Sequence, residues 1–127
     1  MSRLLLDAQT VVWWDHASPT LGERAKAAIR TADTVYVSAA SEWELAIKAG
    51  LGKVQLRRTI LEATLDAGFE LLAISFHHAQ AVRTLKPIHR DPFDRLLVAT
   101  AMVEGLTLVS SDTLLAQYPI PVIDARR

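Results

Sequence analysis

The sequence predicts an α/β fold, specifically a three-layer α/β/α sandwich with a mostly parallel central sheet of four to five strands. Two observations lead to this prediction. Short apolar runs, typical of buried parallel strands, alternate with segments of helical periodicity. The connections between them are short, as in sheets built from crossover helices. The chain has 127 residues without an internal repeat or a flexible linker, so a single domain over residues 1–127 is expected.

Five segments have the composition of strands, because they are short and rich in β-branched, aromatic or leucine residues. In chain order they are residues 3–7 (RLLLD), 34–38 (TVYVS), 69–74 (FELLAI), 106–110 (LTLVS) and 121–124 (PVID). The last of them is expected at an edge of the sheet.

The segments between these strands are expected to be helices. Thr20 and Glu23 stand at capping-box spacing before the first of them. Residues 10–15 (TVVWWD) hold two tryptophans that are expected to pack in the core or line a groove. The first helix is expected to start at Pro19-Thr20, and the second to run from Ser38 or Ser41 to Gly50. The next three are expected to cover residues 57–67, 77–85 and 91–104, and the last to run from Asp112 to Gln117.

The helix over residues 91–104 has the clearest ends. Asp91 is expected to be its N-cap, Pro92 occupies the first helical position, and Gly105 follows the last turn. Its body is apolar on nearly every side, which indicates a buried helix. Asp94 in the first turn is then either part of a well-capped helix end or a metal-binding carboxylate.

Four acidic residues lie after predicted strands or in the first turns of predicted helices, at one edge of the predicted sheet. Asp7 ends the first strand, and Asp112 lies two residues after Ser110 at the end of the fourth. Glu44 lies in the first or second turn after the second strand, and Asp94 opens the buried helix. Because ligands of open parallel sheets collect beyond the carboxyl ends of the strands, these four acids are expected to meet.

Unpaired carboxylates held close together repel one another unless a cation neutralises them. Mg²⁺ and Mn²⁺ prefer oxygen ligands, and such a site can activate water against a phosphodiester. Each acid also has a simpler interpretation: Glu44 could pair with Ser41 or Lys48, and Asp112 could merely cap its helix. The joint pattern of four acids favours a metal site.

The composition limits the partners. Lys plus Arg and Asp plus Glu each number 14, so there is no overall basic field and any nucleic-acid contact must be local. His89, Arg90 and Arg95 lie beside the expected site and are candidate contacts to RNA phosphates. The chain has no cysteine, no segment suited to spanning a bilayer and no visible signal peptide. A cytoplasmic protein without a membrane association is therefore expected.

Four stretches of the chain resemble one known family. They are residues 4–14 (LLLDAQTVVWW), 38–54 (SAASEWELAIKAGLGKV), 89–101 (HRDPFDRLLVATA) and 108–112 (LVSSD), and they occur in the family's order. The chain is similar to PIN-domain proteins, and in particular to the VapC-type ribonuclease toxins of type II toxin–antitoxin systems. The resemblance implies a single PIN-like domain.

The resemblance also implies an activity, a cofactor and partners. It implies an endoribonuclease that uses Mg²⁺ or Mn²⁺ to hydrolyse RNA, with tRNA and rRNA as candidate substrates. It implies a VapB-like antitoxin that neutralises the toxin, and a homodimer. Ser110 and Asp91 would support the metal site. The catalytic and metal-binding acids would be Asp7, Glu44, Asp94 and Asp112.

One departure from the family leaves an alternative open. Ala8-Gln9 stand where relatives with this tryptophan pattern commonly have Thr-His, so the chain could be a catalytically weakened binding module. A DNA-directed phosphodiesterase is a further alternative. A phosphotransferase of the haloacid-dehalogenase type would need an acid at Gln9, and a receiver domain would need paired acids early in the chain.

Overall fold

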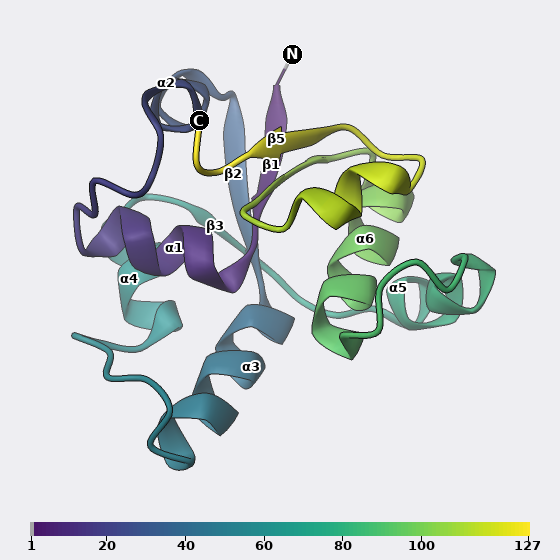
Figure 1. The fold of residues 1–127 in the computed structure, drawn as a ribbon, viewed down its shortest axis with the longest axis horizontal. Helices are drawn as coiled ribbons and strands as arrows, with labels where there is room; N and C mark the ends of the chain where they lie inside the picture. The colour runs from purple at the N-terminus through teal and green to yellow at the C-terminus, as the bar shows by residue number, and fades with distance from the viewer. Residues whose placement is uncertain (1) are drawn as a thin grey trace.

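A computed structural model describes residues 2–127 and shows a five-stranded sheet in which every neighbouring pair is parallel. The order across the sheet is β3-β2-β1-β4-β5, which confirms the α/β prediction and places the last strand at an edge. Figure 1 shows the sheet between its covering helices. The strands are β1 (Arg3–Leu6), β2 (Thr34–Ser38), β3 (Glu70–Leu72), β4 (Thr107–Ser110) and β5 (Val122–Asp124).

Six α-helices and two short 3₁₀ helices cover the sheet in the part of the chain that the structure describes. No helix within residues 2–127 is long and apolar enough to cross a membrane. The α-helices are α1 (Ala8–Asp15), α2 (Glu23–Thr31), α3 (Ala39–Gly50), α4 (Ile60–Asp66), α5 (Phe76–Ala81) and α6 (Pro92–Glu104). The 3₁₀ helices are η1 (Val82–Thr84) and η2 (Thr113–Gln117).

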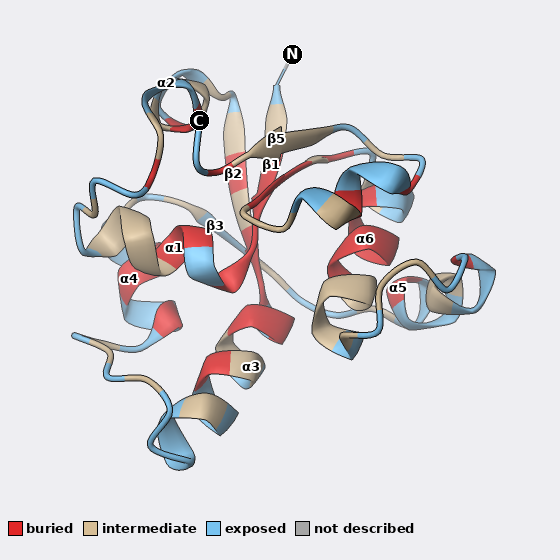
Figure 2. Cartoon of the chain, in the orientation of Figure 1, coloured by how far each residue is buried: buried red, intermediate tan, exposed pale blue. Residues whose placement is uncertain are grey.

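The alternation of side chains along the strands produces two apolar layers. Leu4 and Leu6 of β1 face α1, α2 and α4, whereas Leu5 between them faces α6 and η2. Helix α3 contributes Leu45 to the first layer and Ala40 to the second. It therefore extends beyond the carboxyl ends of the strands, below the sheet in Figure 1, and Figure 2 shows that β1 and the sheet-facing part of α6 are buried.

Several helix ends are those that the sequence predicted. The Asp91 carboxylate accepts hydrogen bonds from the amides of Phe93 and Asp94, with Pro92 in the first turn of α6. Gly105 ends this helix in the left-handed conformation, at φ 68°. Of the two serines considered as caps of α3, Ser38 is the one that accepts from the helix, because its hydroxyl binds the amide of Ala40.

The start of α2 differs from the prediction. The expected capping box of Thr20 and Glu23 is wrong, since the helix begins at Glu23 and its N-cap is Gly22. The amide of Thr20 instead bonds the Ser18 hydroxyl in a turn, and the amide of Gly22 bonds the carbonyl of Ala125. Backbone near the C-terminus thus satisfies a donor that a side-chain cap would otherwise serve.

Residues 10–15, for which no helix was predicted, belong to α1. The Asp7 carboxylate caps this helix through the amide of Thr10. Trp14 packs against Phe69 with ring centroids 5.6 Å apart, and Trp13 is half-buried on the same helix. The expectation that the two tryptophans pack in the core or line a groove is confirmed for Trp14 by this contact.

An ion pair fastens the connection between α3 and α4 to the end of α1. The Asp15 carboxylate is 6% exposed and accepts from Arg58 Nη2 at 2.6 Å, from Arg58 Nε at 2.9 Å and from Arg57 Nη2 at 3.2 Å. Burial alone would raise the pKa of Asp15, but the hydrogen bonds from Arg58 and Arg57 hold it below its usual range. Residues 53–59 are thereby held near α1.

We expect Asp15→Asn to lower the free energy of unfolding by about 1–2 kcal/mol, because it removes a buried charge that three donors share. A depressed pKa stabilises the fold above the unfolded value of about 4, and this contribution is lost as the pH falls through the folded value. Urea unfolding should therefore show a larger difference between the two proteins at pH 7 than at pH 3. Glu23→Gln, which breaks the exposed Lys26–Glu23 pair, is the control and should change little.

Candidate active site

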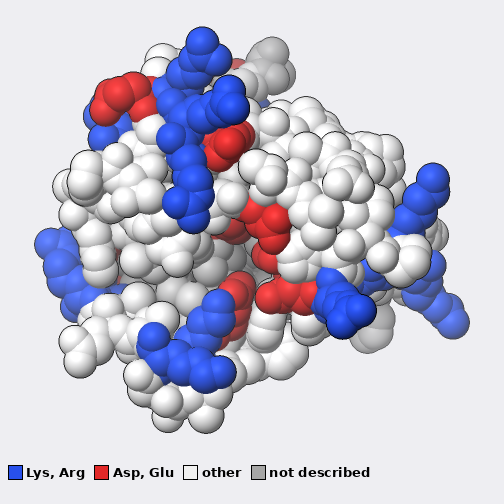
Figure 3. Space-filling view, viewed as in Figure 1, with Lys and Arg blue, Asp and Glu red and all other residues white. Residues whose placement is uncertain are grey.

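The topology of the sheet determines where a site can form. From β1 the chain proceeds to β2 and β3 on one side, and later to β4 and β5 on the other. The crevice beyond the carboxyl ends of β1 and β4 is the switch point of such a sheet, where ligands bind. Asp7 follows β1 and Asp112 follows β4, while α3 and α6 bring Glu44 and Asp94. Figure 3 shows acidic side chains gathered around a hollow at the centre of this face.

Asp7 is held by hydrogen bonds to both of its carboxylate oxygens. Oδ1 accepts from the amide of Thr10 at 2.8 Å and from its hydroxyl at 2.6 Å, and Oδ2 accepts from the Ser110 hydroxyl at 2.7 Å. Burial raises the pKa of Asp7, and the hydrogen bonds from Thr10 and Ser110 offset this only partly. Ser110 also accepts from the amide of Asp112 at 3.0 Å, so its hydroxyl joins the ends of β1 and β4.

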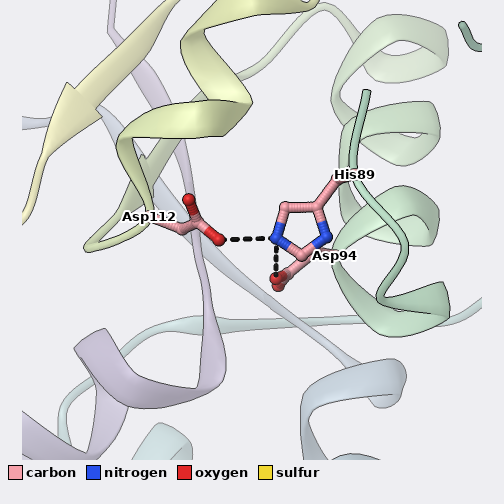
Figure 4. A group of neighbouring side chains, drawn as sticks. All are labelled: His89, Asp94 and Asp112. Carbon is pink, nitrogen blue, oxygen red and sulfur yellow. Dashed lines mark hydrogen bonds and ion pairs between the residues drawn. The ribbon is translucent and has the colours of Figure 1, made fainter. Parts of the chain in front are cut away.

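His89 bridges two of the acids, as Figure 4 shows. Its Nε2 lies 2.5 Å from Asp112 Oδ2 and 3.4 Å from Asp94 Oδ2, and one ligand atom from each of these residues lies within 4.8 Å of the others. The Nδ1 atom accepts from the amide of Asp91 at 2.9 Å. A neutral ring in this position carries its proton on Nε2, and His89 is therefore a donor to Asp112, with Asp94 at ion-pair distance.

The carboxylate of Asp94 is strongly perturbed as well. Its pKa is raised to about 7, mainly by burial. The charges of Asp91, Asp7 and Glu44 contribute to this increase, and His89 opposes it. Glu44 forms the predicted ion pair with Lys48, with 2.6 Å between Oε2 and Nζ, and remains close enough to act on Asp94. Asp94 therefore lies within electrostatic range of Asp7 and Glu44, and beside Asp112.

Arg95 and the buried Tyr118 hold the loop that carries His89. Arg95 Nη1 donates to the carbonyl of Lys86 at 3.0 Å and to the Tyr118 hydroxyl at 3.3 Å. The Tyr118 hydroxyl accepts from the amide of His89 at 3.0 Å and donates to the same Lys86 carbonyl. Arg90, by contrast, is exposed at the edge of this loop. The guanidinium of Arg95 is thus occupied by the loop, and phosphate contacts by these residues stay predictions.

Two residues of this network were not anticipated from the sequence. Thr10 stands three residues after Asp7, which is the spacing of an N-cap and its N3 partner, so this signal was available. Tyr118 lies 29 residues from His89, and no local pattern connects them. The departure at Ala8-Gln9 leaves the Asp7 contacts intact, because Thr10 and Ser110 supply the hydroxyls that hold it.

The match to a family model identifies the class of protein. The PIN domain model matches residues 4–121, and the chain belongs to the PIN domain family. Within curated proteins, the chain is similar to Ribonuclease VapC22 of Mycobacterium tuberculosis (strain ATCC 25618 / H37Rv). The two are 32% identical over 127 residues, which is 96% of this chain and 98% of that protein.

Solved structures share the fold. VapBC2 from Rickettsia felis, bound to a DNA fragment from its promoter, aligns with a TM-score of 0.70 at 17% identity over 96% of this chain and 98% of that one. FitAcB from Neisseria gonorrhoeae gives a TM-score of 0.66 at 21% identity over 96% and 97%. DNA-bound VapBC from Salmonella typhimurium gives 0.67 at 17% identity over 98% of both chains.

Proposed function

We propose that this chain is a VapC-type toxin, a metal-dependent endoribonuclease that a VapB-like antitoxin neutralises. The observation that carries the proposal is the meeting of four acids from separate segments at the switch point, where burial, together with the charges of Asp91, Asp7 and Glu44, raises the pKa of Asp94 to about 7. Carboxylates held this close favour a bound cation. The 32% identity to a protein named as a ribonuclease supports RNA as the substrate.

The residues fit a hard divalent cation. All four acids offer oxygen ligands, and Asp7 Oδ2, which accepts from the Ser110 hydroxyl, keeps a second lone pair for a cation. Asp7 and Asp94 would hold Mg²⁺ or Mn²⁺, with Glu44 and Asp112 beside them. The ion would activate water and neutralise charge on the phosphodiester.

The remaining polar residues of the site would orient these acids. His89 donates to Asp112 from Nε2, the nitrogen that a metal ligand would need, so we assign it to positioning this carboxylate rather than to binding the ion. Asp91 would act through its cap of α6 and through its charge on Asp94. Arg90 remains our candidate for a phosphate contact.

A cleavage assay tests this function. The purified chain, free of any antitoxin, is incubated with tRNA, rRNA fragments and single-stranded DNA in Mg²⁺, in Mn²⁺ or with EDTA. We expect cleavage of RNA only, dependent on the metal and lost in EDTA. Absence of both RNA cleavage and calorimetric Mn²⁺ binding would reject the enzyme and favour the binding module.

Ser110→Ala should weaken the metal site without removing a ligand. The substitution takes away the donor to Asp7 Oδ2 and the acceptor of the Asp112 amide. Loss of a side chain that orients a metal ligand typically costs about 10–100-fold in metal affinity, and we expect a fall of this size in calorimetric Mn²⁺ titration. Ser111→Ala, one residue further on, is the control. An equal effect of both substitutions would contradict the assignment.

We also propose the partners and the compartment that the family suggests. Trp43 and Ile47 of α3 and Leu51 at its C-cap are exposed: Trp43 is 57% and Leu51 65% accessible. An apolar face of this kind is covered by a partner in many proteins, and a VapB-like antitoxin or a second copy in a homodimer would cover it. The complex would act in the cytoplasm. Light scattering of the chain with and without antitoxin would measure the assembly.

A further inference from the structure

We propose that a groove beside the acids binds one unstacked nucleobase of the substrate RNA. The groove lies between α1 and the connection from α3 to α4, and encloses about 590 Å³. This proposal rests on the proposed function and adds how the RNA is held next to the site. No residue of the acid cluster itself lines the groove.

The lining of the groove combines the two features that a nucleobase needs. Trp13 supplies an indole, and Leu45 and Leu56 supply apolar surface. Gln9 and Gln55 supply side-chain amides, each of which can both donate and accept hydrogen bonds. Unstacked bases of single-stranded RNA are recognised in this way, by stacking on aromatic rings and by hydrogen bonds to their edges.

This mixed lining distinguishes the groove from its apolar neighbour. The cavity of about 280 Å³ between α4 and β3 is lined mainly by apolar groups, among them Ile60, Leu61 and Leu71. A protein segment with apolar side chains would suit that cavity, whereas amides beside an indole suit a planar polar ring. RNA is therefore the occupant that the lining favours.

The groove lies next to the acid cluster, and Lys48 connects the two. Lys48 lines the groove, and its ammonium lies 2.6 Å from the Glu44 carboxylate. Gln9 follows Asp7 by two residues at the start of α1. Figure 3 shows the hollow at the acids with basic side chains at its border. A nucleotide with its phosphate at the acids can thus direct its base toward Trp13.

The walls of the groove are held in place before any ligand arrives. The pairing of Asp15 with Arg58 fastens the connection that carries Gln55 to the end of α1. The guanidinium of Arg126 lies 5.2 Å from the centroid of the Trp13 ring, which restrains the indole. A preformed site loses less conformational entropy on binding than one that must be ordered.

Trp13→Leu tests the proposal, with Trp14→Leu as a matched control. Trp14 is the adjacent half-buried tryptophan of the same helix, but it packs on Phe69 and does not line the groove. On an RNA that the wild type cleaves, base stacking of this kind predicts a KM increase of about tenfold or more for Trp13→Leu, with kcat retained. Gln55→Ala, an exposed substitution that leaves the fold intact, should raise KM in the same direction.

Abasic substitutions identify the base. Each nucleotide near the cleaved bond is replaced in turn by an abasic one. We expect one position to raise KM in the wild type and to have no further effect in Trp13→Leu, because the two changes remove the same contact. Mn²⁺ affinity, measured by calorimetry, should be unchanged in both tryptophan variants.

Two results would contradict the assignment of the groove to a nucleobase without contradicting the nuclease activity. One is equal KM values for Trp13→Leu and Trp14→Leu. The other is that the effect of Trp13→Leu on KM adds to the effect of every abasic substitution. Weaker antitoxin binding with an unchanged KM would likewise assign the groove to a protein partner. If the wild type neither binds Mn²⁺ nor cleaves RNA, both the proposed function and the assignment of the groove to RNA are contradicted.

Discussion

Asp94→Asn is expected to abolish metal-dependent RNA cleavage. The substitution is nearly isosteric, and it removes one of the two carboxylates that we assign to holding the metal. The loss in Mn²⁺ affinity should exceed the roughly 10–100-fold typical of a side chain that only orients a ligand. Cleavage of RNA in Mn²⁺ and calorimetric titration measure the two effects on one preparation. Glu70→Gln, an exposed acid on β3, is the control.

The metal-free variant should also be more stable than the wild type at pH 8. A folded pKa of about 7 means that the native state keeps the Asp94 proton after the unfolded chain has lost it. The free energy of unfolding of the wild type therefore falls as the pH rises from about 4 to about 7. Asparagine does not titrate, so the Asp94→Asn protein does not lose this stability. Thermal unfolding in EDTA measures the difference. If Asp94→Asn is less stable than the wild type in EDTA and still binds Mn²⁺ with unchanged affinity in the titration, Asp94 lies outside the site.

The second large effect concerns pH. The Asp94 proton must leave before its carboxylate can hold a cation, so metal and proton compete. Below pH 7, Mn²⁺ affinity should fall by about tenfold or more for each pH unit, because the pKa of Asp7 is raised as well. Calorimetry in buffers of different ionisation enthalpy should show about one proton or more released per ion at pH 6. An affinity that stays constant between pH 6 and pH 8 would contradict the raised pKa as a property of the metal site.

Local patterns allowed much of the fold to be predicted. The strands are short apolar runs that can be recognised without knowledge of tertiary contacts. Asp91, Pro92 and Gly105 mark the ends of α6 by their own conformational preferences. The convergence of the acids followed from a general property of parallel sheets. These predictions succeeded because each depends on neighbouring residues or on the topology alone.

Other features depend on contacts that the sequence does not reveal. Helix α1 was missed because TVVWWD is rich in β-branched and aromatic residues, and its formation relies on the Asp7 cap and on packing against the sheet. Thr20 failed as a cap because backbone near the C-terminus occupies the donor at Gly22. The bond between His89 and Asp112 joins residues 23 apart through a loop that Arg95 and Tyr118 shape.

Locating the metal tests the central claim most directly. Crystals grown or soaked in Mn²⁺ would be measured at the manganese absorption edge, where the anomalous signal identifies the ion. We expect a peak between the Asp7 and Asp94 carboxylates, within coordination distance of both, and no such peak in Asp94→Asn. A peak only at surface carboxylates such as Asp66 or Glu70, or no peak at all, would contradict the metal-dependent nuclease.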